Sequence, residues 1–181
     1  MASLASNARL LVEERSGFVA ATVIARRGRK AELARLIADQ TGLAAEDGPK
    51  AVSNDRFASW GVAPGSWLLF HTAPDGNWPG GLAEALAPAG SVIDQSSTYV
   101  LLRLRGLHAE ALLQKGLFID LALAAFPSGS CAAGPIAHIA VILARTGEES
   151  FEVAVPRSYV ESFRHWLESA AEAADITLEA G

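Results

Sequence analysis

The sequence is poor in the residues that cross-link chains or bind metals. Its 181 residues include a single cysteine, Cys131, so an internal disulfide framework is excluded. The four histidines are scattered, and none is spaced from another as in a His-x-x-x-His or His-Glu-x-x-His motif. We therefore expect neither a disulfide-stapled fold nor a metal site on this chain.

Charged residues are also scarce, at 19%, whereas half of the chain is apolar. This composition excludes intrinsic disorder, because the chain has ample apolar surface to bury. Fifteen basic against twenty acidic residues give a net charge of −5, the wrong sign for a nucleic-acid binder, which needs a basic surface. We expect no nucleic-acid partner.

Long apolar runs are missing as well. Residues 1–15 contain two Glu and two Arg and do not resemble a secretory signal. The longest stretch without an acidic residue, 121–147, contains Pro127, Pro135, His138 and Arg145, which excludes a continuous membrane-spanning helix. The expected location is the cytoplasm, with no membrane partner.

The first half of the chain has a clear order of elements. Lys30–Thr41 places Leu33 and Ile37 on one stripe and is followed by Gly42, which is typical of a helix and its C-terminal stop. Pro64-Gly65 between two apolar runs predicts a hairpin turn. The elements expected here are strands over 18–24, 56–62, 67–72 and 91–94, and helices over 30–41 and 81–86.

The second half repeats this order. Ser158 and Glu161 stand three residues apart, as in a capping box, and predict the start of a helix with Phe163 and Leu167 on its buried stripe. A second helix is expected over 107–115, and strands over 98–104, 136–144, 151–155 and 175–179.

These patterns predict an α+β fold with two tandem β-α-β-β-α-β lobes, of the ferredoxin-like or split βαβ kind. We expect a single domain over 1–181, with a first lobe at about 15–95 and a second at about 96–179. A lobe of this size buries too little surface to be stable alone. A fused sheet or a shared interface between the lobes is therefore expected.

The sequence contains no recognisable catalytic motif. Cys131 lies among small residues, without a nearby His or Lys to lower its pKa, which favours an unreactive buried thiol over a nucleophile. Asp94 and Asp120 each follow an apolar run and are typical turn residues. The basic run at 26–30 lacks the glycine-rich loop of a phosphate site. We predict no catalytic, cofactor-binding or metal-binding residue on this chain.

A series of short motifs nevertheless runs through the second half of the chain. It consists of Gly106 after a strand, Lys115-Gly116 at a helix end, Asp120-Leu121, Phe126-Pro127-Ser128-Gly129, and Arg157-Ser158-Tyr159 before a helix containing Trp166. This series resembles the gamma subunit family of heterotetrameric sarcosine oxidase. The hairpin from Trp60 to Leu69, which includes Trp67, also resembles the family. The likeness covers most of residues 15–178, with departures at Leu117, where the family commonly has Cys, and Gly134, where it has Thr.

The resemblance implies a non-catalytic structural subunit. Similar complexes oxidatively demethylate sarcosine to glycine and transfer the one-carbon unit to tetrahydrofolate. It implies alpha, beta and delta subunits as partners, with FAD, FMN, NAD, tetrahydrofolate and zinc held by those subunits and none by this chain. The family is itself similar in fold to the folate-binding T-protein of glycine cleavage.

Two alternatives remain open at the level of sequence. The chain resembles equally the corresponding subunit of complexes that act on N-methylglutamate. A free-standing, T-protein-like folate-binding protein would instead need a buried carboxylate in a central cavity, for which Asp94 and Asp120 are the candidates.

Aromatic residues around the first hairpin are candidates for a partner interface, because aromatics are favoured interface anchors. Trp60, Trp67 and Trp78 lie within nineteen residues of one another. Trp60 and Trp67 fit the core of the first lobe equally well. Trp78 has the most loop-like setting and is the preferred anchor, and Arg157 is a candidate fixed charge for the interface or a partner of an internal carboxylate.

Overall fold

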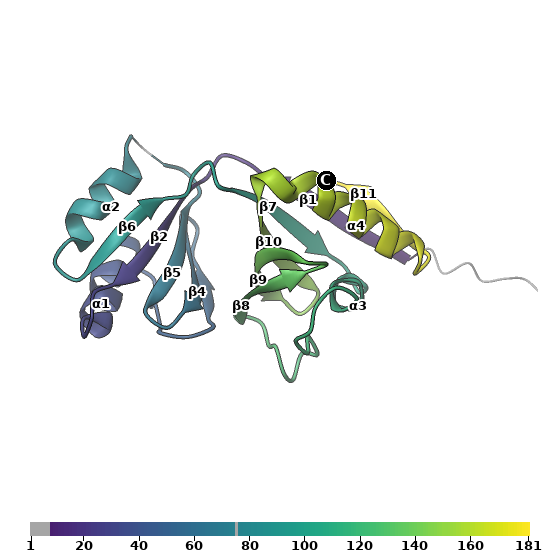
Figure 1. The fold of residues 1–181 in the computed structure, drawn as a ribbon, viewed down its shortest axis with the longest axis horizontal. Coiled ribbons are helices and arrows are strands. Elements are labelled where there is room, and N and C mark those ends of the chain that lie inside the picture. The colour runs from purple at the N-terminus through teal and green to yellow at the C-terminus, as the bar shows by residue number, and fades with distance from the viewer. Residues whose placement is uncertain (1–7, 75) are drawn as a thin grey trace, which may run out of the picture.

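The computed structural model describes residues 8–74 and 76–181, and the remaining positions of the expected domain, 1–7 and 75, lie outside this description (Figure 1). No helix within the described ranges has the length and apolar character needed to cross a membrane. The elements are β1 (Ala8–Arg15), β2 (Val19–Ala25), α1 (Lys30–Thr41), β3 (Ala51–Ser53), β4 (Phe57–Ala63), β5 (Ser66–His71), α2 (Trp78–Leu86), β6 (Gly90–Asp94), β7 (Tyr99–Arg105), α3 (Ala109–Gln114), β8 (Cys131–Ile136), β9 (Ile139–Gly147), β10 (Ser150–Pro156), a 3₁₀ turn (Arg157–Tyr159), α4 (Val160–Glu172) and β11 (Ile176–Ala180).

The first sheet has the strand order β3-β4-β5-β2-β6, with antiparallel pairs throughout. Helices α1 and α2 cover one of its faces through a core that includes Leu33, Ile37, Leu82 and Trp67. Helix α1 has the expected bounds and ends at Gly42, which adopts a left-handed φ of 70°. The hairpin β4–β5 also forms where Pro64-Gly65 predicted it.

The second sheet has the order β11-β1-β7-β10-β9-β8. Its core against α3 and α4 includes Leu10, Leu104, Phe151 and Phe163. Strand β1 lies between β7, to which it is antiparallel, and β11, to which it is parallel. Strand β1 was not expected from the sequence. It joins the sheet of the second half because side chains alternate between the two faces of a strand, and this alternation buries Leu10 completely in the core.

Two local predictions in the second half are wrong. The single strand expected over 136–144 is instead the end of β8 and the start of β9, joined by a two-residue turn. Ala137 and His138 form that turn with φ of 47° and 70°, the conformation that tight hairpins require at both positions. The expected capping box is also wrong, because among the described residues no side chain caps α4, whose N-cap residue is Tyr159 rather than Ser158.

The two sheets pack face to face, and the helices lie on the outer faces (Figure 1). Strand alternation sends Trp60, Leu68 and Phe70 of the first sheet toward Leu101 and Ala154 of the second. The halves therefore share an interface through stacked sheets rather than through one continuous sheet. The result is an α+β protein with two sheets.

Gly116, after α3, permits close packing against α4. A Cβ at this position would lie 2.6 Å from Trp166 Cζ2 and 2.9 Å from Ile136 Cγ2. We expect Gly116→Ala to lower the free energy of unfolding by about 1–3 kcal/mol, because overpacking displaces neighbouring groups. Urea unfolding followed by circular dichroism measures this loss. The matched control is Gly134→Ala, whose added Cβ meets no described atom within 4 Å; equal stability of the two variants contradicts the prediction.

Candidate functional site between the two sheets

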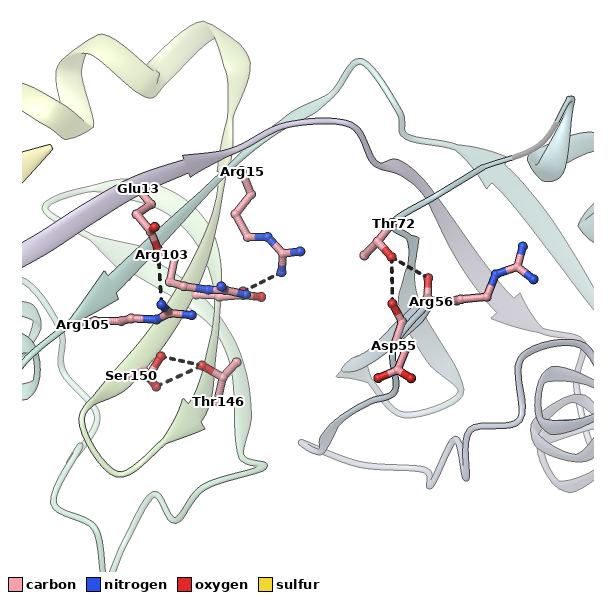
Figure 2. A network of polar contacts seen from close by, with 10 residues as sticks. Glu13, Arg15, Asp55, Arg56, Thr72, Arg103, Arg105, Thr146 and Ser150 are labelled. Atoms are coloured by element: carbon pink, nitrogen blue, oxygen red, sulfur yellow. Dashed lines mark hydrogen bonds and ion pairs between the residues drawn. The ribbon is translucent and has the colours of Figure 1, made fainter. Parts of the chain in front are cut away.

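A cavity of about 320 Å³ lies at one edge of the interface between the sheets. Arg15, Arg103 and Glu152 line it from the second sheet. The opposite wall comes from the first sheet and the β3–β4 connection, with Thr72 and Asp55 on it. Figure 2 shows the arginines of one sheet on the side that faces Thr72 and Asp55 of the other. The site therefore exists only because the two halves pack together.

Glu152 is the buried carboxylate of this cavity, with 4% of the residue exposed. Its Oε1 accepts hydrogen bonds from Arg15 Nη1 at 2.9 Å and Arg103 Nε at 2.8 Å, and a further one from Arg103 Nη2. The sheet register explains the pairing, since Glu152 on β10 lies directly opposite Arg103 on β7. Two cations surround one carboxylate, so the second-sheet wall carries a net positive charge.

The opposite wall is held by local hydrogen bonds. Thr72 Oγ1 donates to the carbonyl oxygens of Asp55 and Arg56, each at 3.2 Å. Asn54 Oδ1 accepts from the backbone N–H groups of Arg56 and Phe57, at 3.0 and 2.8 Å. The side chain of Arg56 points away from the cavity (Figure 2) and its Nη2 lies 3.3 Å from His71 Nε2. This wall is thus a tight, hydrogen-bonded turn.

The three candidate tryptophans separate into different environments. Trp60 lies between the sheets and Trp67 lies under the helices, with 2% and 1% of each residue exposed. Both residues therefore belong to the core, and the expectation that they anchor a partner interface is corrected. Trp78 begins α2 rather than lying in a loop, is half-buried, and its ring centroid is 5.4 Å from that of His71.

Most of the family-motif residues lie around α3 and the start of α4, whereas Gly129 and Trp60 line the cavity. Gly106 adopts a φ of 135° after β7, and Trp166 packs on Gly116. Arg157 donates from Nε and Nη2 to the carbonyl oxygens of Ser97 and Tyr99, at 3.1 and 3.4 Å. The exposed motif residues in this region are Lys115, Asp120, Arg157, Ser158 and Tyr159.

Neither carboxylate singled out in the sequence is buried. Asp120 is exposed, and its Oδ1 accepts from the Ala122 N–H at 2.8 Å. Asp94 is exposed as well, and hydrogen bonds from the Ser96 hydroxyl and N–H lower the pKa of its carboxyl. Both are turn residues, as expected. Sequence reasoning missed Glu152, although its place as an acid inside the apolar run Phe151–Val155 was a usable signal.

Arg145 is a second buried charge that the sequence did not reveal. It is fully buried beneath α3, forms an ion pair with Glu110, and donates from Nη2 to the Leu121 carbonyl at 2.8 Å. Its guanidinium lies 4.6 Å from the centre of the Phe151 ring. Arg145 therefore ties the segment after α3 to the second sheet.

That segment presents an apolar surface to solvent. Phe118 is 92% exposed, and Ile119 and Leu123 are also exposed. We call these three residues the α3–β8 apolar patch. Exposed apolar groups of this size, gathered in one segment, are typical of an interaction surface.

The candidate metal ligands and the single thiol were also located in the structure. Among the described residues, no three His, Cys, Asp or Glu side chains gather as metal ligands. Cys131 is fully buried, and burial raises the pKa of its thiol to about 12. The thiol is therefore protonated and shielded at neutral pH.

Comparison of the sequence with known proteins points consistently to one family. The model of the sarcosine oxidase gamma subunit family matches residues 50–173. Sarcosine oxidase subunit gamma from Arthrobacter sp. is 35% identical over 132 residues, and that from Corynebacterium sp. (strain P-1) is 33% identical over the same length. Each match covers 70% of this chain and 63% of the relative, so the chain spans less than two thirds of these relatives.

Solved structures extend the likeness to nearly the whole chain. A chain of heterotetrameric sarcosine oxidase from Corynebacterium sp. U-96, in complex with pyrrole 2-carboxylate, matches with a TM-score of 0.79 and 26% identity, covering 93% of this chain and 86% of that one. The glycine cleavage aminomethyltransferase T from Bartonella henselae matches with a TM-score of 0.64 at 19% identity, covering 97% of this chain and 49% of that one. The second likeness shows the fold alone.

Burial of Cys131 leads to a direct test of its reactivity. We expect the native thiol to react with a disulfide reagent on the order of 100-fold more slowly than in the chain unfolded by guanidinium chloride. Absorbance of the released thiolate measures both rates. Because the folded pKa is raised, the thiol contributes stability that falls as the pH rises above about 8.5. Equal rates in the native and unfolded chains contradict the burial.

Proposed function

Because the chain belongs to the sarcosine oxidase gamma subunit family, we propose that it is the non-catalytic structural subunit of a heterotetrameric sarcosine oxidase. The observation that carries this proposal is the 0.79 TM-score to a chain of such an enzyme over 93% of the present chain. The complex would oxidatively demethylate sarcosine to glycine and pass the one-carbon unit to tetrahydrofolate. Sarcosine, rather than N-methylglutamate, is favoured because the family, both relatives and the solved complex all carry its name.

The proposal assigns the chemistry to other chains. The alpha, beta and delta subunits are the partners. These subunits hold FAD, FMN, NAD, tetrahydrofolate and zinc, and the complex is located in the cytoplasm. A free-standing folate-binding role is less well supported, because Asp94 and Asp120 are exposed turn acids. The carboxylate that is buried, that of Glu152, is already bound by two arginines.

We also infer that each half is built on one β-α-β-β-α-β unit. The order β4-β5-β2-β6 supports this for the first half, with α1 and α2 as the two helices. In the second half the order β9-β10-β7-β11 would be the same, with β1 inserted between β7 and β11. Insertion of β1 ties the N-terminal segment to the far end of the chain.

The α3–β8 apolar patch is the docking surface that fits this role best. An obligate subunit buries apolar side chains against its partner, and the patch exposes Phe118 almost completely. Trp78 remains the candidate anchor on the first half, because it is only half-buried. The two positions lie on different halves, so they can be tested separately.

The first test concerns catalysis by the isolated chain. We expect the purified chain to be colourless and to consume no oxygen with sarcosine, because the proposed role places the flavins and the oxidation of sarcosine on the alpha and beta subunits. Visible absorbance and an oxygen electrode measure the two properties. A bound yellow chromophore that co-elutes with the folded chain contradicts the proposal, as does sarcosine-dependent oxygen uptake.

The second test concerns assembly. We expect Phe118→Asp to weaken co-purification with co-expressed alpha and beta chains by at least about tenfold, because a charge would be buried at the interface. Trp78→Ala tests the other anchor in the same assay. Ile93→Asp is the matched control, since Ile93 is an exposed apolar residue on β6 of the first sheet. Assembly that is unchanged by Phe118→Asp and Trp78→Ala, with both chains folded, shows that these anchors are wrong.

A further inference from the structure

We propose that the cavity between the sheets binds a small organic molecule with one carboxylate group and an apolar body, through Arg15 and Arg103. This site is separate from the α3–β8 apolar patch and does not depend on the subunit role. The proposal rests on three features of the cavity: its charge, its donors that remain open, and the composition of its opposite wall.

The charge on the second-sheet wall of the cavity is unbalanced. Arg15 and Arg103 share one carboxylate, and all three of their hydrogen bonds end on the same oxygen, Glu152 Oε1. Other arginines on this face of the sheet have a carboxylate each: Arg9 pairs with Glu179 at 2.9 Å and Arg105 with Glu13 at 3.6 Å. On the second-sheet wall, Arg15 and Arg103 therefore carry one positive charge more than Glu152 neutralises, in a chain whose net charge is −5.

The two guanidinium groups also have donors to spare. Arg15 uses only Nη1 in its bond to Glu152, and Arg103 uses Nε and Nη2. Their side chains are 33% and 22% exposed, so they are held in place yet reach the cavity. A planar guanidinium fork matches the two oxygens of a carboxylate.

The remaining walls select the rest of the ligand. Ala51, Ala58, Phe57 and Trp60 give the first-sheet side an apolar surface, and the hydrogen-bonded turn at 54–57 keeps it in place. A volume of about 320 Å³ is at the lower end of small-molecule sites. A singly charged ligand fits better than a phosphate dianion, because Glu152 and Asp55 also line the cavity.

The concave shape favours a small molecule over an acidic side chain of a partner subunit. The cavity lies between the two sheets, with walls from both, and Arg15 and Arg103 lie on its second-sheet wall (Figure 2). A partner's side chain would have to enter between those walls. The experiment below therefore also tests whether a carboxylate of a partner subunit binds these arginines.

The experiment measures binding of benzoate to the full chain by titration calorimetry and ligand-observed NMR. We expect saturable binding of benzoate and none of benzamide, its neutral analogue. Arg15→Gln and Arg103→Gln should each weaken binding by about fivefold, and Arg9→Gln, on the same face of β1, should leave it unchanged. Glu152→Gln should strengthen binding by about fivefold, because it removes the carboxylate that competes for both arginines.

Several results overturn the proposal. These are absence of saturable benzoate binding, equal binding of benzamide, tighter binding of inorganic phosphate, or benzoate affinity that is the same in the parent chain and in Arg15→Gln. If Arg103→Gln does not fold, Arg15→Lys keeps the charge without the planar fork and should still weaken binding. Loss of co-purification with the alpha and beta chains in Arg15→Gln, without benzoate binding by the parent, would assign the arginines to a partner's carboxylate instead.

Discussion

The packing of one sheet on the other is the interaction on which the rest of this structure depends. Each half covers only one face of its sheet with helices, so the other face needs a partner. Trp60 and Phe70 meet Leu101 and Ala154 at that shared face. A half of this size would be marginal alone, and the sheet interface supplies the additional burial. Insertion of β1 beside β7 reinforces it, because the chain enters the second sheet before it builds the first.

The same interface explains where polar groups gather. At one edge of it, apolar residues give way to Arg15, Arg103 and Glu152, which together form a cavity wall. A carboxylate with 4% exposure is stable there because it accepts three hydrogen bonds from two cations. Charge that is poorly compensated within one sheet thus faces the other sheet, and this is the arrangement that a ligand carboxylate would complete.

The family motifs serve packing more than chemistry. Gly116 makes room for Trp166, Arg157 binds two backbone carbonyls, and Asp120 closes a turn. These contacts shape the surroundings of α3 and the segment that carries Phe118.

Local features of this protein were determined by sequence alone: helix α1 with its stop at Gly42, the hairpin at Pro64-Gly65, and the α+β class, because each depends on neighbouring residues. The motif series also identified the family, since short motifs survive in order along the chain. Tertiary structure decided the place of β1, the burial of Trp60 and Trp67, and the meeting of Arg15, Arg103 and Glu152. Those outcomes depend on residues far apart in the chain, such as Arg15 and Glu152, which are 137 positions apart. Hydrophobic periodicity carries no information about which strands become neighbours.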